Sequence, residues 1–170
     1  CSASIINGPN IRKHSVDYAV NWVLHLYRDK GVRWINVIDD NFTFDIHYAK
    51  AFCEAIIAHG LTDLRFGSPN GIRMERGDKE LWSLMRKAGW EFLAVAPESG
   101  SKRVLDLMRK KLDLDTVPRI VKDIREAGLE VRGFFLVGYP GETREDIKAT
   151  SRLIRATPFD SIFIVRFQPL

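Results

Sequence analysis

The chain has 170 residues, of which 45% are hydrophobic and 28% charged, and its formal net charge is +4. This length suits one packed domain better than two, so we predict a single domain over residues 1–170. Lys and Arg are scattered along the chain, which favours a solvated surface over a nucleic-acid-binding groove. The sequence shows neither a membrane-spanning apolar run nor a signal peptide, so it predicts a cytoplasmic protein.

Strands and helices alternate along the predicted chain. After loop-like residues 2–14, capping residues and helical periodicity predict helices over residues 15–30, 45–59, 78–88, 101–108, 115–127 and 143–156. Apolar runs predict strands over residues 32–38, 64–67, 90–96, 131–137 and 162–167. Residues 68–78 are expected to form the loop after the second of these strands.

Glycines end four of the predicted helices, at positions 31, 60, 89 and 128. A helix–Gly–strand unit that recurs about every thirty residues is typical of βαβ construction with a parallel sheet. Five such strands fit either an incomplete (βα) barrel or a doubly wound sheet. A G-x-G-x-x-G pattern does not follow the first strand, which argues against a dinucleotide-binding sheet.

The stretch GFFLVGYPGET, residues 133–143, combines a buried strand with a glycine-lined turn and a helix start. Glycine at 138 and 141 would let a flat ring lie against the backbone, and Thr143-x-x-Asp146 resembles a capping box. The same pattern also fits an ordinary strand–turn–helix joint. The carboxyl edge of a parallel sheet is nevertheless where α/β proteins bind ligands.

Polar residues and glycines follow each predicted strand at that edge. They are Asp39, Asp40, Asn41, Ser68, Asn70, Arg73, Glu98, Ser99, Ser101, Gly138, Gly141, Glu142 and Gln168. Each one alone could merely cap a helix, but their gathering on one rim indicates a polar ligand with hydroxyl and amine groups. Arg73 and Arg166 could each hold a carboxylate. The four histidines lack the spacing of a zinc site.

Several segments resemble the radical S-adenosylmethionine (radical SAM) enzymes, in the branch that often carries a cobalamin-binding domain. They are Cys1-Ser2, INVIDDNFT, RFGSPNGIR, APESGSKRVLDLMRKKLDLD, GFFLVGYPGET and FIVRFQPL. The resemblance implies a partial (βα)6 TIM-like barrel with a parallel sheet, here lacking the first strand. It also implies a 4Fe-4S cluster whose open iron is chelated by S-adenosylmethionine (SAM). Reductive cleavage of SAM would then give a deoxyadenosyl radical.

The resemblance places SAM-binding residues after four strands. Asp40 and Asn41 would lie near the amino group of SAM, and Glu98 and Ser99 near its ribose or methionine portion. The backbone of residues 135–138, which include Phe135, Val137 and Gly138, would approach the adenine. Arg73 would bind the methionine carboxylate or the substrate.

Cys1 would be the third cluster ligand, as the end of a C-x-x-x-C-x-x-C motif whose first two cysteines are absent. Cys53 lies in a helical pattern and cannot replace them. We therefore expect the chain to be a piece of a longer protein, without cluster or activity by itself. Its open sheet edge could pair with a second copy. The whole protein would act on a small-molecule substrate, with flavodoxin or ferredoxin as electron donor.

Three alternatives follow from the same residues. The leading hypothesis is a cobalamin-linked methyltransferase or a ring-forming oxidoreductase, and the Glu98-Ser99-Gly100-Ser101 segment favours it over a methylthiolating enzyme of transfer RNA. A barrel that only binds a nucleotide or a partner is the second class. An ordinary barrel enzyme that uses Asp40, Glu98 and Glu142 as acid and base is the third.

Overall fold

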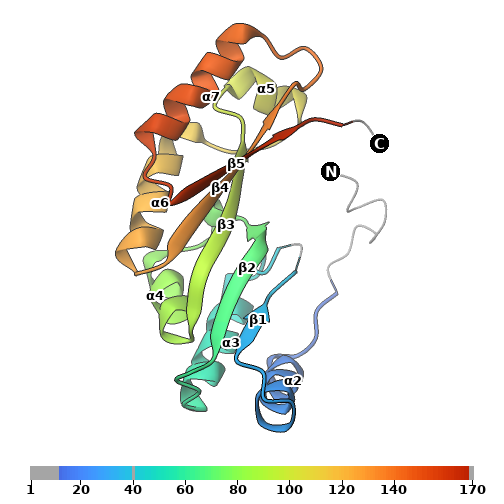
Figure 1. Cartoon of the computed structure of the whole chain (residues 1–170), viewed down its shortest axis with the longest axis vertical. Coiled ribbons are helices and arrows are strands. Elements are labelled where there is room, and N and C mark those ends of the chain that lie inside the picture. The colour runs from blue at the N-terminus through green and yellow to red at the C-terminus, as the bar shows by residue number, and fades with distance from the viewer. Residues whose placement is uncertain (1–11, 40, 169–170) are drawn as a thin grey trace.

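The computed structural model describes residues 12–39 and 41–168. Within them, the chain forms one sheet of the strands β1 (Trp34–Asn36), β2 (Arg65–Ile72), β3 (Trp90–Glu98), β4 (Glu130–Val137) and β5 (Ser161–Arg166). The strands lie in chain order and all neighbours run parallel (Figure 1). The predicted α/β architecture with a parallel sheet is confirmed.

One helix precedes β1, and the others return the chain from the end of one strand to the start of the next. They are α2 (Val16–Asp29), α3 (Ile46–Ala58), α4 (Lys79–Lys87), α5 (Lys102–Leu107), α6 (Val117–Glu126) and α7 (Arg144–Ala156), with the 3-10 turns η1 (Met74–Arg76) and η2 (Leu114–Thr116). Among the described residues, none of these helices has both the length and the apolar character needed to cross a membrane.

Most predicted helix ends are confirmed because they rest on local chemistry, but the helix predicted from residue 115 begins at Val117, because Asp115 belongs to the 3-10 turn η2. Side chains of Ser15, Asp45, Asp78 and Ser101 each accept a backbone N–H of the first helical turn. The glycines at 31, 60, 89 and 128 all have positive φ, which lets the chain leave each helix in the left-handed conformation. At Gly89 a Cβ would also lie 2.4 Å from the Leu64 carbonyl oxygen.

The second strand was predicted too short. β2 runs from Arg65 to Ile72, so Ser68 and Asn70 lie in the strand and not in a loop after it. A register shift lets the strand continue, because three residues of β2 lie opposite one of β3 between the Ser68–Leu93 and Ile72–Val95 pairs. Gly71 takes a φ of 96° within this irregularity. The edge strand β1 is shorter than predicted, covering only Trp34–Asn36.

The sheet packs one of its faces against the helices. Ile35, Phe66, Leu93 and Val131 belong to the core cluster, together with apolar residues of α2, α3, α4 and α6. The rings of Phe66 and Trp90 stack there with centroids 4.4 Å apart. The Trp90 indole donates to the Ser68 hydroxyl over 3.0 Å, so this buried serine serves the core. We call this side the helix-covered face and the other the open face.

Asp146 at the start of α7 ties two strand–helix turns together. Its carboxylate accepts hydrogen bonds from Ser101 over 2.6 Å and from the Thr143 hydroxyl over 2.6 Å, and it pairs with Arg103. Thr143 and Asp146 form the predicted capping box. The turns after β3 and β4 are therefore fixed relative to each other by one buried carboxylate.

The pKa of Asp146 lies well below its ordinary value of 3.8, because the Arg103 guanidinium and the Ser101 and Thr143 hydroxyls all stabilise the charged form. A depressed pKa adds stability above the unfolded-state value, which is lost as the pH falls towards the folded-state value. We predict that Asp146→Asn lowers the urea midpoint of unfolding at pH 7 and that the difference from the wild type shrinks at pH 3. Asp106→Asn, in an exposed pair with Lys102, should change the midpoint little. An equal gap at both pH values would contradict this role.

Candidate functional site

The carboxyl ends of all five strands lie along one edge of the sheet, because every neighbour is parallel (Figure 1). We call this edge, with the turns that follow the strands, the rim. Predicted site residues after β1, β2, β3 and β4 lie at the rim within the described chain. Asp40 lies outside the described residues, as does Cys1.

The turns after β1 and β2 are held together by Thr43, whose side chain is buried. Its hydroxyl donates to the Arg73 carbonyl and accepts from the Arg73 N–H, both over 3.1 Å. Asn70 donates to the Ile38 carbonyl over 3.1 Å, which adds a second link. Arg73 is thus fixed at its backbone, while its exposed guanidinium has no hydrogen-bond or ion-pair partner among residues 12–39 and 41–168. It remains available for a carboxylate.

Asn41 lies at the same corner of the rim. Its N–H donates to the Asp39 carboxylate over 2.7 Å, which closes a tight turn after β1. Its side-chain oxygen lies 3.5 Å from the Thr43 hydroxyl. Asn41 is half-buried and belongs to the cluster that positions Arg73.

Glu98 ends β3 in the left-handed conformation, with a φ of 67°. Its carboxylate pairs with Lys110 over 3.2 Å, and the same ammonium donates to the Ala96 carbonyl. A non-glycine residue at such a φ carries strain of roughly 1–3 kcal/mol, which is most often found at functional sites. The side chains of Glu98 and Lys110 remain 25% and 32% exposed, so both charges reach the rim.

Ser99 lies just beyond, but its side chain points into the structure. It is fully buried, its hydroxyl lies 3.2 Å from that of Thr150 on α7, and it accepts the Ser101 N–H. Gly100 packs so closely on α7 that a Cβ would lie 2.6 Å from the Ala149 carbonyl oxygen. The predicted contact between Ser99 and a cofactor remains a prediction, and its hydroxyl is already occupied by the turn.

The turn after β4 combines bare backbone with an unsatisfied acceptor. Gly138 is exposed, has a φ of 80° and donates its N–H to Glu142 Oε2 over 2.5 Å. Glu142 Oε1 is buried and has no hydrogen-bond partner among the described residues. A buried carboxylate oxygen without a donor is unfavourable, so a further hydrogen-bond donor would stabilise this atom.

Phe135 and Val137 lead into this turn. The Phe135 side chain is fully buried and meets Phe159 edge to face, with centroids 5.7 Å apart. The Val137 carbonyl accepts the Phe167 N–H over 2.8 Å. Phe135 therefore offers no ring to the rim, and Gly138 has the most accessible backbone of this segment.

Within residues 12–39 and 41–168, the side chains do not form a cluster of three or more His, Cys, Asp or Glu residues that could hold a metal. Cys53 is fully buried in α3, and burial raises the pKa of its thiol well above the ordinary value. The structure thus confirms that Cys53 is a small buried core residue.

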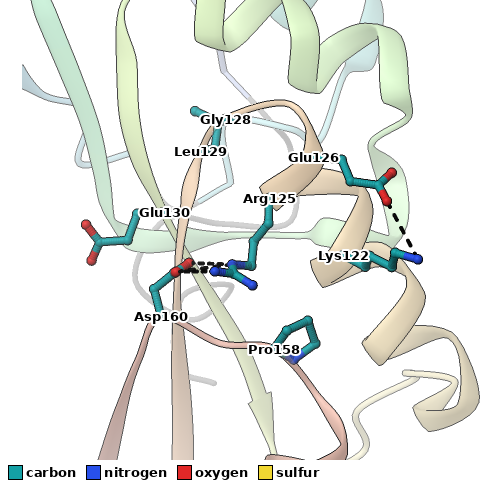
Figure 2. A pocket seen from close by; sticks show the side chains of 8 residues that line it. All are labelled: Lys122, Arg125, Glu126, Gly128, Leu129, Glu130, Pro158 and Asp160. Atoms are coloured by element: carbon teal, nitrogen blue, oxygen red, sulfur yellow. Dashed lines mark hydrogen bonds and ion pairs between the residues drawn. The ribbon is translucent and has the colours of Figure 1, made fainter.

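A hollow at the opposite edge of the sheet is not part of this site. Figure 2 shows it between the end of α6, the start of β4 and the start of β5. Arg125 and Asp160 face each other across it, with both carboxylate oxygens 3.1 Å from the guanidinium Nε. Asp160 also accepts the Val131 N–H over 2.8 Å. These charges satisfy each other and anchor β5, so the hollow lacks a free group for chemistry.

Lys110 and Thr43 were not predicted from the sequence. Lys110 lies twelve residues after Glu98, in the loop that follows α5, and Thr43 lies thirty residues before Arg73. A local sequence pattern does not predict either pair, Glu98 with Lys110 or Thr43 with Arg73. The only available signal was that each follows a strand or a short helix on the rim side of the fold.

Comparison with known proteins connects this geometry to a family. The Radical SAM superfamily model matches residues 1–154. The cytidylyl-2-hydroxyethylphosphonate methyltransferase of Streptomyces wedmorensis is 31% identical over 177 residues, which cover 100% of this chain and 33% of the relative. The anaerobic magnesium-protoporphyrin IX monomethyl ester cyclase of Cereibacter sphaeroides is 28% identical over 135 residues, 79% of this chain and 22% of the cyclase.

A solved structure shows the same fold at low identity. It is the radical SAM methyltransferase TsrM from Kitasatospora setae, with cobalamin and a [4Fe-4S] cluster bound. The TM-score is 0.82 at 20% identity, over 93% of this chain and 32% of TsrM. The chain thus spans about a third of the length of the methyltransferases it matches. The parallel sheet, its rim and the match over residues 1–154 together show that the chain belongs to the Radical SAM superfamily.

Proposed function

We propose that this chain forms the SAM-binding part of a radical SAM enzyme that transfers a methyl group, or closes a ring, on a small-molecule substrate. The observation that carries this proposal is the turn after β4, where exposed Gly138 backbone lies beside Glu142 Oε1, which has no hydrogen-bond partner in the described part of the chain. An adenosine group supplies a flat ring for the first, and hydroxyl and amine donors for the second.

The remaining rim groups suit the other end of the same cofactor. The Glu98 carboxylate can accept from ribose hydroxyls or an ammonium group, and the Arg73 guanidinium can bind a carboxylate. Asn41 helps to hold that corner through the Thr43 hydroxyl. When bound, a reduced 4Fe-4S cluster supplies the electron that cleaves the carbon–sulfur bond of SAM. Cys1 stays the proposed cluster ligand of this chain.

The relatives support the finer assignments. A methyltransferase that aligns with all of this chain favours methyl transfer, and a neighbour with bound cobalamin favours a cobalamin-linked reaction. We further propose a cytoplasmic protein with flavodoxin or ferredoxin as electron donor. Pairing of two copies would use the three-residue edge strand β1, where Trp34 is 48% exposed.

The first test changes Glu142 to Gln and measures SAM affinity by calorimetry of the chain. Loss of the charged acceptor should weaken SAM binding about tenfold, which corresponds to about 1.4 kcal/mol. Glu145→Gln is the matched control, because it makes the same charge change three residues later, in the first turn of α7, where Glu145 is paired with Lys148 and exposed. An unchanged affinity in the Glu142 variant, or an equal loss in both, would remove the carrying observation.

The second test separates the carboxylate end of SAM from the rest. Arg73→Gln should weaken SAM binding, while the binding of decarboxylated SAM should stay the same, because only SAM itself offers the group that the guanidinium holds. Arg155→Gln, in the last turn of α7, controls for the lost surface charge. If the variant weakens both ligands alike, Arg73 does not bind the carboxylate.

A further inference from the structure

The open face of the sheet carries a continuous group of rings. Trp34 and Phe92 stack with centroids 6.3 Å apart, and a Cβ at Gly67 would lie 2.3 Å from the Phe92 ring, which places all three on one side. The Arg132 guanidinium lies over Phe92, 3.6 Å from the ring centroid. These residues alternate along their strands with Ile35, Phe66 and Val131 of the helix-covered face.

The next row of the open face is a stacked aromatic pair. Phe134 lies two residues after Arg132, and Phe163 is its partner in register on β5. Their rings are nearly parallel, at 12° with centroids 4.8 Å apart. Phe163 is 44% exposed and Val165, two residues further along β5, is 49% exposed. Ile162 and Ile164, on the other side of this edge strand, are 40% and 61% exposed, so the open face is distinguished by its stacked rings and not by exposure alone.

A polar group lies between the two sets of rings. Arg132 Nε and Nη2 donate to the Glu130 carboxylate over 2.8 and 3.4 Å, which neutralises the charge and fixes the guanidinium plane. Its Nη1 has no hydrogen-bond partner among the described residues. Ser161, the partner of Arg132 in register, has a buried hydroxyl that is also unpartnered there. Arg132, Glu130 and Ser161 together can donate a hydrogen bond to an acceptor but carry no net charge.

We propose that the open face binds the substrate of the enzyme, and that this substrate is a planar conjugated ring system with an oxygen acceptor at its edge. The face would stack the ring system against Phe134 and Phe163, and Arg132 would donate to the oxygen. This inference rests on the proposed function, because it places the substrate on the same sheet whose rim would hold SAM. A non-planar aliphatic substrate could not stack on the Phe134 and Phe163 rings. It would also present no flat edge to the Arg132 guanidinium plane.

The test titrates the chain with 2-naphthoate and with its saturated analogue decahydro-2-naphthoate, followed by ligand-observed NMR. Both carry one carboxylate and have the same carbon skeleton, but only the first is flat. We expect the wild type to bind 2-naphthoate at least fivefold more tightly. Phe163→Leu, which keeps apolar bulk and removes the ring, should reduce this preference about fivefold.

Ile164→Leu is the matched control, since Ile164 lies next to Phe163 on β5 but on the opposite side, and it is 61% exposed. It should keep the preference for the flat ligand. Equal binding of the two naphthoates by the wild type would overturn the inference, and this comparison needs no variant to fold. Equal effects of the two substitutions would overturn it as well. SAM titration is separate, so a failure of SAM binding would count against the proposed function only.

Discussion

The rim depends on the buried carboxylate of Asp146. It holds the turn after β3 through Ser101 and Arg103, and the turn after β4 through Thr143. Parallel strands bring their carboxyl ends to one edge, but they do not fix the loops that follow. Three residues that donate to one acidic side chain supply that fixation. Glu98 and Gly138, at the neighbouring ends of β3 and β4, keep their relative positions because of it.

Most of the fold could be predicted because its signals are local. The caps at Ser15, Asp45 and Asp78 and the glycines that end α2, α3, α4 and α6 act within a single turn of chain. The extent of β2 could not be predicted, because its continuation depends on a register shift against β3. The sequence segment Ser68–Gly71 has the composition of a loop, and only the neighbouring strand makes it part of the sheet.

The position of the candidate site could be predicted from the sequence, but the side-chain atoms that remain free there could not. The βα repeat placed Glu98, Arg73 and Glu142 at one edge, and the structure brings them there. The sequence repeat could not show that the Ser99 hydroxyl faces Thr150, because the two residues lie 51 positions apart in sequence. For the same reason, the pairing of Glu98 with Lys110 was missed. Burial and long-range partners decide which side chains remain free, and single-sequence patterns carry little of that information.

Glu98 keeps a backbone conformation that glycine adopts without strain. Glycine at this position would relieve the strain of roughly 1–3 kcal/mol in the folded chain. Selection for a stable fold alone would therefore favour losing the side chain at this point. The side chain that glycine would lack forms the ion pair with Lys110 and stays partly exposed at the rim, so a strained backbone and a placed carboxylate occur together at this position.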